Sequence, residues 1–121
     1  MTSALVIDDN KQTTEALVQM LKIWDIEARS ALGPGAAMKM LSEEVPKVVF
    51  LDINMPGVDG FDVLAYMRRE PRLEAVPVIV VTSDVQPETS RRAIERGAKA
   101  VVLKPVTVDM LEGALKEASI I

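Results

Sequence analysis

The chain has 121 residues, of which 49% are hydrophobic and 26% are charged, the size and balance of one globular domain. It contains no cysteine and no histidine, which excludes disulfides, thiolate or imidazole metal sites and Ser-His-Asp catalysis. The formal net charge of −4 argues against nucleic-acid binding, which requires a basic surface. No apolar run is long enough to span a membrane, so a cytoplasmic protein is predicted.

Four short apolar runs predict buried strands, at residues 4–7, 48–51, 77–81 and 100–103. Each run is apolar throughout rather than alternating, which indicates that both faces of its strand are covered. Strands of this kind belong to a mostly parallel sheet between two layers of helices. The weaker run 26–31 carries charges and predicts a fifth strand at an edge of the sheet.

Amphipathic stretches between the strands predict five helices. They cover residues 12–24, 34–44, 59 onward, 87–97 and 107 onward. Asp59 is a natural N-cap, and Pro87 suits a first helical turn. The inward face of the last helix is predicted to consist of Val108, Leu111, Leu115 and Ala118. The strand–helix unit thus occurs five times, which predicts one doubly wound α/β domain over residues 1–121, with no second domain.

Polar side chains follow the carboxyl ends of the strands, where ligand sites form in such sheets. They are Asp8 and Asp9, Asp52, Thr82 to Asp84, and Lys104. Each has an ordinary structural explanation: a helix cap, an Asx-turn, an ST-turn and a surface lysine. Taken together, however, three carboxylates raise one another's pKa unless a cation lies among them. A divalent ion with Lys104 removes that cost, so the group is interpreted as a site.

These residue types predict phosphoryl chemistry at a site for Mg²⁺, or Mn²⁺, because only oxygen ligands are available. Asp9 and Asp52 would bind the ion together with a backbone carbonyl near Asn54, and Asp8 would orient a bound water. Asp52 would attack a phosphoryl group and form an aspartyl-phosphate. Lys104 and the Thr82 hydroxyl would neutralise the phosphoryl oxygens beside the ion.

Four motifs, VIDDN, LDINMPGVDG, VVTSD and LKP, together resemble the receiver domain of two-component response regulators, and the resemblance covers essentially the whole chain. It implies a flavodoxin-like, CheY-like fold with a five-stranded parallel sheet in the order 2-1-3-4-5. It also implies that Asp52 accepts phosphate from a sensor histidine kinase or a histidine phosphotransfer protein. Asp8 and Asp9 would form the acidic pair, Thr82 the switch hydroxyl and Lys104 the phosphate-sensing lysine. In this family the Lys104–Pro105 peptide bond is often cis.

The donor histidine must come from a partner, because the sequence contains none. Contacts of the phosphoryl group with Thr82 and Lys104 would shift the domain to the form that a downstream protein recognises. The family usually has an aromatic residue or histidine three positions before the lysine, whereas this chain has Val101, which has no ring to swing. The arginines of helix 87–97, Val101 and the last helix form the predicted surface for a partner or a homodimer.

Two alternatives stay open at this point. The first is a receiver-like interaction module that is never phosphorylated, which only Val101 favours. The second is a haloacid-dehalogenase-like phosphatase, but that family has its nucleophile on the first strand, and here Asn54 follows Asp52 where the usual general acid would be. In the preferred interpretation the chain catalyses only its own phosphorylation and dephosphorylation at Asp52. Asp84 would then either repel or orient the hydrolytic water.

Overall fold

A computed structural model describes residues 2–121 and contains one five-stranded parallel sheet. Its strands are β1 (Thr2–Asp8), β2 (Ile26–Leu32), β3 (Val48–Asp52), β6 (Val78–Thr82) and β7 (Ala100–Leu103). The order β2-β1-β3-β6-β7 is 2-1-3-4-5 when the strands of this sheet are counted alone. The predicted fold is therefore confirmed, and β2 lies at an edge of the sheet as its charges indicated.

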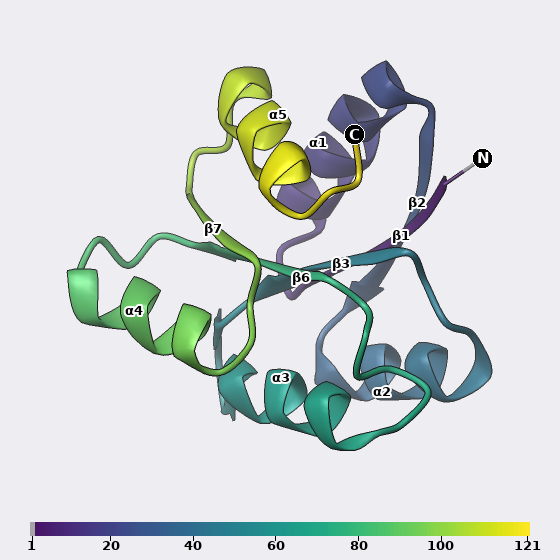
Figure 1. Ribbon diagram of the computed structural model, residues 1–121, viewed down its shortest axis with the longest axis vertical. Helices are drawn as coiled ribbons and strands as arrows, with labels where there is room; N and C mark the ends of the chain where they lie inside the picture. The colour runs from purple at the N-terminus through teal and green to yellow at the C-terminus, as the bar shows by residue number, and fades with distance from the viewer. Residues whose placement is uncertain (1) are drawn as a thin grey trace.

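Five helices cover the two faces of the sheet and make a three-layered molecule (Figure 1). On one face lie α1 (Lys11–Leu21) and α5 (Val108–Glu117), and on the other lie α2 (Pro34–Glu43), α3 (Gly60–Arg69) and α4 (Pro87–Glu95). A short 3-10 helix, η1 (Lys22–Trp24), extends α1. Within residues 2–121, no helix is both long and apolar enough to cross a membrane.

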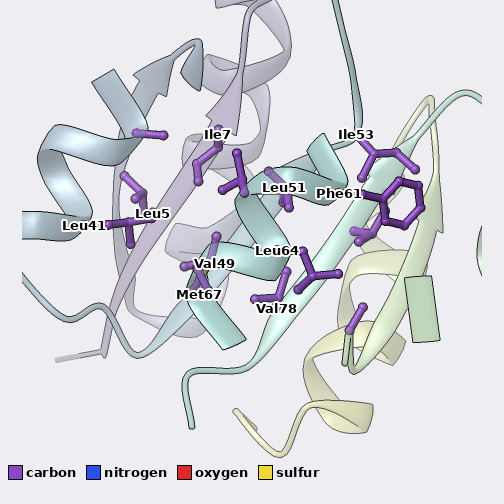
Figure 2. Packing of buried hydrophobic residues seen from close by; sticks show 14 of the residues in the cluster. Leu5, Ile7, Leu41, Val49, Leu51, Ile53, Phe61, Leu64, Met67 and Val78 are labelled. Carbon is purple, nitrogen blue, oxygen red and sulfur yellow. The ribbon is translucent and has the colours of Figure 1, made fainter. Parts of the chain in front are cut away.

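The strands distribute their side chains alternately between two apolar cores. Leu5 and Ile7 of β1 belong to the core under α2, α3 and α4, whereas Ala4 and Val6 belong to the core under α1 and α5. Figure 2 shows the first core, in which residues of β3 such as Leu51 lie against α3. Because side chains of a strand repeat every two residues, the same alternation decides which strand-end residues share a face.

Three of the five α-helices begin at a residue whose side chain caps them, whereas α2, with Gly33 as its N-cap, and α4 do not. Asn10, Asp59 and Thr107 each accept a hydrogen bond from a backbone N–H of the following turn, and so cap α1, α3 and α5. The N-cap of α4 is Gln86, whose side chain makes no such bond. The capping interpretation of the Asp8-Asp9-Asn10 stretch thus holds for Asn10.

Two features of the fold differ from the sequence-based expectations. Residues 54–59 form a small hairpin of β4 (Asn54–Met55) and β5 (Val58–Asp59), whose strands are too short to produce a periodic pattern. Val108 was predicted to face inward, which is wrong, since it is 39% exposed while Leu111 and Leu115 are buried. Helical periodicity puts Val108 on the same side of α5 as Leu111 and Leu115. It carries no information on whether other parts of the chain reach far enough to cover the first residue of the helix.

Candidate functional site

The register of the sheet brings Asp8 and Asp52 side by side. Ile7 of β1 pairs with Leu51 of β3, so the next residues, Asp8 and Asp52, end neighbouring strands at the same level. Both are almost fully buried, at 2% and 4% exposure, whereas Asp9 is exposed. One carboxylate oxygen from each of the three residues lies within 4.8 Å of the others. The predicted acidic cluster is therefore present at the carboxyl edge of the sheet.

Lys104 supplies one positive charge to this cluster. It follows β7, and its Nζ lies 2.8 Å from Asp8 Oδ2 and 3.4 Å from Asp52 Oδ2. The backbone N–H of Lys104 also donates to the carbonyl oxygen of Thr82, and the Lys104–Pro105 peptide bond is cis, as the resemblance implied. A single ammonium among three carboxylates leaves a surplus of negative charge at this rim.

Lys104 interacts more closely with the carboxylate of Asp8 than with that of Asp52. Burial opposes ionisation of Asp8, but the hydrogen bond from Lys104 and the N–H of Asn10 outweigh it and lower the pKa of Asp8. Burial raises the pKa of Asp52, and the negative charge of Asp8 adds to that rise. Burial works against the ammonium of Lys104, yet its bond to Asp8 and the charge of Asp52 raise its pKa. Ionised Asp52 is thus the least compensated of these charges.

Asp52 also forms the Asx-turn that its sequence context suggested. Its Oδ1 accepts the backbone N–H of Asn54 at 2.9 Å, while its Oδ2 is the oxygen that faces Lys104. The turn and the site therefore use different oxygens of one carboxylate, so the ordinary explanation and the functional one hold together. The turn fixes the direction of the side chain at the edge of the sheet.

Gly60 supports this arrangement, and sequence reasoning missed it. Its N–H donates to the carbonyl oxygen of Ile53, and α3 begins directly against the chain that follows Asp52. A Cβ atom at position 60 would lie 2.4 Å from Ile53 Cα and 2.7 Å from the Asp52 carbonyl oxygen. Only glycine permits this close approach. The available signal was a glycine as the first residue of a helix, immediately after a capping aspartate.

Thr82 is fully buried and is held by two hydrogen bonds to its hydroxyl oxygen. The backbone N–H of Asp84 donates at 3.0 Å, which is the expected ST-turn, and Asn54 Nδ2 donates at 2.8 Å. The sequence predicted a role for the carbonyl of Asn54 but not this bond from its side chain. Both carboxylate oxygens of Asp84 accept bonds from the start of α4, from Gln86 N and Thr89 Oγ1.

The arginines of α4 are partly engaged within the domain. The guanidinium of Arg92 lies 4.0 Å from the centroid of the Phe61 ring and 3.8 Å from Asp59 Oδ2, and Arg96 lies 5.5 Å from the same ring. These contacts tie α4 to the beginning of α3. Val101, the residue at the position that is usually aromatic, is half-buried and packs against the core under α4.

An apolar groove of about 520 Å³ lies beside the acidic cluster. Its walls come from α1 and from the segment that follows β7, and they include Leu17, Met20, Lys104, Pro105 and Val106. Lys104 therefore lies both among the carboxylates and at the edge of a surface large enough to contact another protein's side chains.

Comparison with known families identifies the chain. A family model described as the response regulator receiver domain matches residues 4–116. The chain belongs to the response regulator receiver domain family. The receiver domain therefore acts in two-component signalling, and the comparisons support this function rather than a haloacid-dehalogenase-like phosphatase.

Several known proteins resemble the chain along its length. Protein PilH of Pseudomonas aeruginosa is 30% identical over 111 residues, which cover 92% of each chain. Response regulator PleD of Caulobacter vibrioides is 29% identical over 88% of this chain, but the match covers 24% of PleD. The solved signal receiver domain of a DNA binding response regulator from Colwellia psychrerythraea superimposes with a TM-score of 0.89, at 28% identity over both complete chains. Chemotaxis protein CheY4 of Vibrio cholerae has the same TM-score at 22% identity, over 98% of each chain, which is a likeness of fold alone.

Proposed function

We propose that Asp52 is the phosphoacceptor of this receiver domain. The observation that carries the proposal is a buried carboxylate at the carboxyl end of a central strand, with a raised pKa and a single lysine shared with a second carboxylate. A sensor histidine kinase or a histidine phosphotransfer protein supplies the phosphoryl group, because this chain has no histidine of its own.

The transfer is a displacement at phosphorus. A carboxylate oxygen of Asp52 attacks the phosphorus of the partner's phosphohistidine, a P–O bond forms and the P–N bond breaks. The imidazole leaves with the electron pair and takes a proton from solvent. The Asx-turn contributes by holding Asp52 through Asn54 N, so that the attacking side chain is oriented before the donor arrives.

The acidic cluster fits Mg²⁺, with Mn²⁺ as an ion of similar ligand preference. It offers only carboxylate oxygens, it carries more negative charge than Lys104 compensates, and exposed Asp9 leaves one side open to the waters that Mg²⁺ retains. Asp9, Asp52 and the backbone carbonyl of Asn54 would hold the ion, and Asp8 would orient a bound water. When bound, the ion supplies positive charge that stabilises the phosphoryl oxygens.

Lys104 and Thr82 complete the proposed site. Lys104 Nζ already lies 3.4 Å from Asp52 Oδ2, so a short movement lets it donate to a phosphoryl oxygen as well. The Thr82 hydroxyl accepts two hydrogen bonds, which leaves its own proton to donate to a second phosphoryl oxygen. Both contacts favour the phosphorylated arrangement, to which a downstream protein would bind.

The groove beside Lys104 is the proposed contact surface for the phosphodonor protein, because it adjoins the acidic cluster at Lys104. The face formed by α4, β7 and α5 is the proposed surface for a downstream partner or a second copy of the chain. A location in the cytoplasm stays a prediction from the sequence.

The test is incubation of the protein with Mg²⁺ and acetyl phosphate, followed by mass spectrometry. We expect one acid-stable, base-labile adduct on Asp52, which is absent in Asp52→Asn and present in the control Asp109→Asn, a substitution at an exposed aspartate of α5. A folded protein without the adduct would instead be the interaction module. Sustained hydrolysis of a small phosphate ester would indicate a phosphatase.

A further inference from the structure

The strand at one edge of the sheet, β2, is long and regular. Among residues 2–121 it has a neighbouring strand on its β1 side alone, and its seven residues pair with β1 in an unbroken register. The strand at the other edge, β7, has four residues. An exposed edge strand is a template for pairing with another chain, and proteins often block it by a short strand, a proline or a bulge. The sequence of β2, IEARSAL, contains no proline, and its continuous register leaves no bulge.

The direction of the backbone groups decides which residues of β2 can pair outward. The N–H of Gly33, directly after β2, donates to the carbonyl oxygen of Asp8 in β1. Backbone groups of successive residues in a strand point to opposite sides. The odd-numbered residues of β2 therefore direct their N–H and C=O groups to β1, and the even-numbered residues direct theirs away from the sheet. Ala28, near the middle of the strand, is one of the outward residues.

The charges of β2 are complementary to those of a second copy of the same strand. In a two-fold antiparallel pairing, each residue lies opposite the residue equally far on the other side of the centre. With the centre at Ala28, Glu27 lies opposite Arg29 of the second copy, and Arg29 lies opposite its Glu27. Two cross-strand pairs of opposite charge result. A shift of the centre by one residue would instead put Glu27 opposite Glu27, or Arg29 opposite Arg29, so the charges favour the register centred at Ala28.

The side chain of Arg29 is already oriented before any such contact. Its Nη1 lies 2.7 Å from Oε2 of Glu44, the C-cap residue of α2, and the two side chains are 60% and 38% exposed. A guanidinium has five N–H donors, so Arg29 can bind Glu44 and Glu27 of a second copy together. A side chain that is held beforehand loses less conformational entropy on association.

The same register brings an exposed leucine to a mostly apolar groove. The groove has a volume of about 310 Å³ and lies between α1 and the beginning of β2, where Val18, Ile26 and Ala28 are among its lining residues. Leu32, at the other end of β2, is 50% exposed. Because side chains of a strand repeat every two residues, Leu32 lies on the same face of β2 as Ile26 and Ala28. In the register centred at Ala28, Leu32 of the second copy falls just beyond Ile26, at this groove.

We propose that this receiver domain forms a symmetric homodimer by antiparallel pairing of β2 with β2 of a second copy, which joins the two five-stranded sheets into one. Backbone hydrogen bonds around Ala28 hold the strands together, the pairs of Glu27 with Arg29 fix the register, and Leu32 covers the groove of the other copy. Because the paired strands run in opposite directions, the two acidic clusters lie at opposite edges of the joined sheet. The face formed by α4, β7 and α5 is at the far edge of each sheet and stays free.

The test measures the dissociation constant of the dimer by analytical ultracentrifugation over a series of protein concentrations. Glu27→Arg and Arg29→Glu each put like charges opposite one another twice in a dimer, so each is expected to raise the dissociation constant on the order of tenfold to a hundredfold. An equimolar mixture of the two variants restores opposite charges at both contacts of the mixed dimer. The mixture should therefore associate as tightly as the natural protein, which a defect in folding would not produce.

Arg91→Glu is the matched control, because it makes the same change at an exposed arginine of α4. It should leave the dissociation constant unchanged, and a weaker dimer in this variant would assign the contact to the face of α4, β7 and α5 instead. The proposal is overturned if the natural protein stays monomeric up to about 1 mM. It is also overturned if the two single variants dimerise like the natural protein, or if their mixture associates no more tightly than either variant alone.

Discussion

Replacement of Gly60 by alanine is expected to damage both the stability of the fold and the phosphorylation site. The added Cβ would lie 2.4 Å from Ile53 Cα and 2.7 Å from the Asp52 carbonyl oxygen. Ordinary contacts begin near 3.4 Å, so the backbone must separate by about 1 Å. Both opposing atoms belong to the main chain, so no side-chain rotation can relieve the clash.

The expected loss in the free energy of unfolding of Gly60→Ala follows from this geometry. Overpacking of a buried site costs about 1–3 kcal/mol, which exceeds the gain of at most about 1 kcal/mol from alanine in place of glycine in a helix. Gly113 of α5 provides the matched control, because nothing lies within 4 Å of the position that a Cβ atom would occupy there. Gly113→Ala is therefore expected to stabilise the protein by about 0.5–1 kcal/mol, the opposite sign for the same substitution.

Urea unfolding measures the two changes in the free energy of unfolding. Because the displaced atoms belong to Asp52 and Ile53, phosphorylation by acetyl phosphate should also slow in Gly60→Ala. A misplacement of about 1 Å at a reacting group can lower a rate on the order of a hundredfold. Gly113→Ala should be phosphorylated at the natural rate. Natural stability and natural phosphorylation in Gly60→Ala would refute the conclusion that α3 is packed directly against this backbone.

Three further substitutions test the charges and the backbone. Lys104→Met, measured by urea unfolding without Mg²⁺, should lose about 1–3 kcal/mol at pH 7. The loss should shrink on acidification, because Asp52, whose pKa is raised, takes up a proton first and Asp8, whose pKa is lowered, does so at more acidic pH; a loss independent of pH would contradict this. Asp52→Asn should be more stable than the natural protein without Mg²⁺. Because the pKa of Asp52 is raised in the folded protein, its ionised carboxylate costs stability that the asparagine variant does not lose. The stability advantage of Asp52→Asn over the natural protein appears above the unfolded pKa of about 3.9, grows up to the folded pKa and amounts to about 1.36 kcal/mol per unit by which the pKa is raised. A stability difference that is constant across that pH interval would refute the argument. Gly97→Ala should lower Tm, with a loss of about 1 kcal/mol or more, because Gly97 has φ +105° and its Cβ would lie 2.9 Å from Arg68 Nε; an unchanged Tm would exclude strain there.

The sequence predicted the elements well because the relevant signals are local. Continuous apolar runs identified the buried strands, and the caps Asp59 and Thr107 begin α3 and α5. The same local signals failed where burial depends on distant parts of the chain. Val108 lies on the expected side of α5 and is nevertheless exposed, and the 54–59 hairpin has strands too short for a pattern.

The functional groups of the site could also be identified in the sequence, as carboxylates, a hydroxyl and a lysine that follow successive strands. The sequence determined these residue types and their positions at strand ends. Only the tertiary structure decided that Asp8 and Asp52 end neighbouring strands at one level, with Lys104 closer to Asp8 than to Asp52. The reason is that register, close approach at Gly60 and bonds such as Asp84 to Thr89 depend on how separate elements pack. Local propensity says what each element is, but the packing of the elements decides which side chains meet.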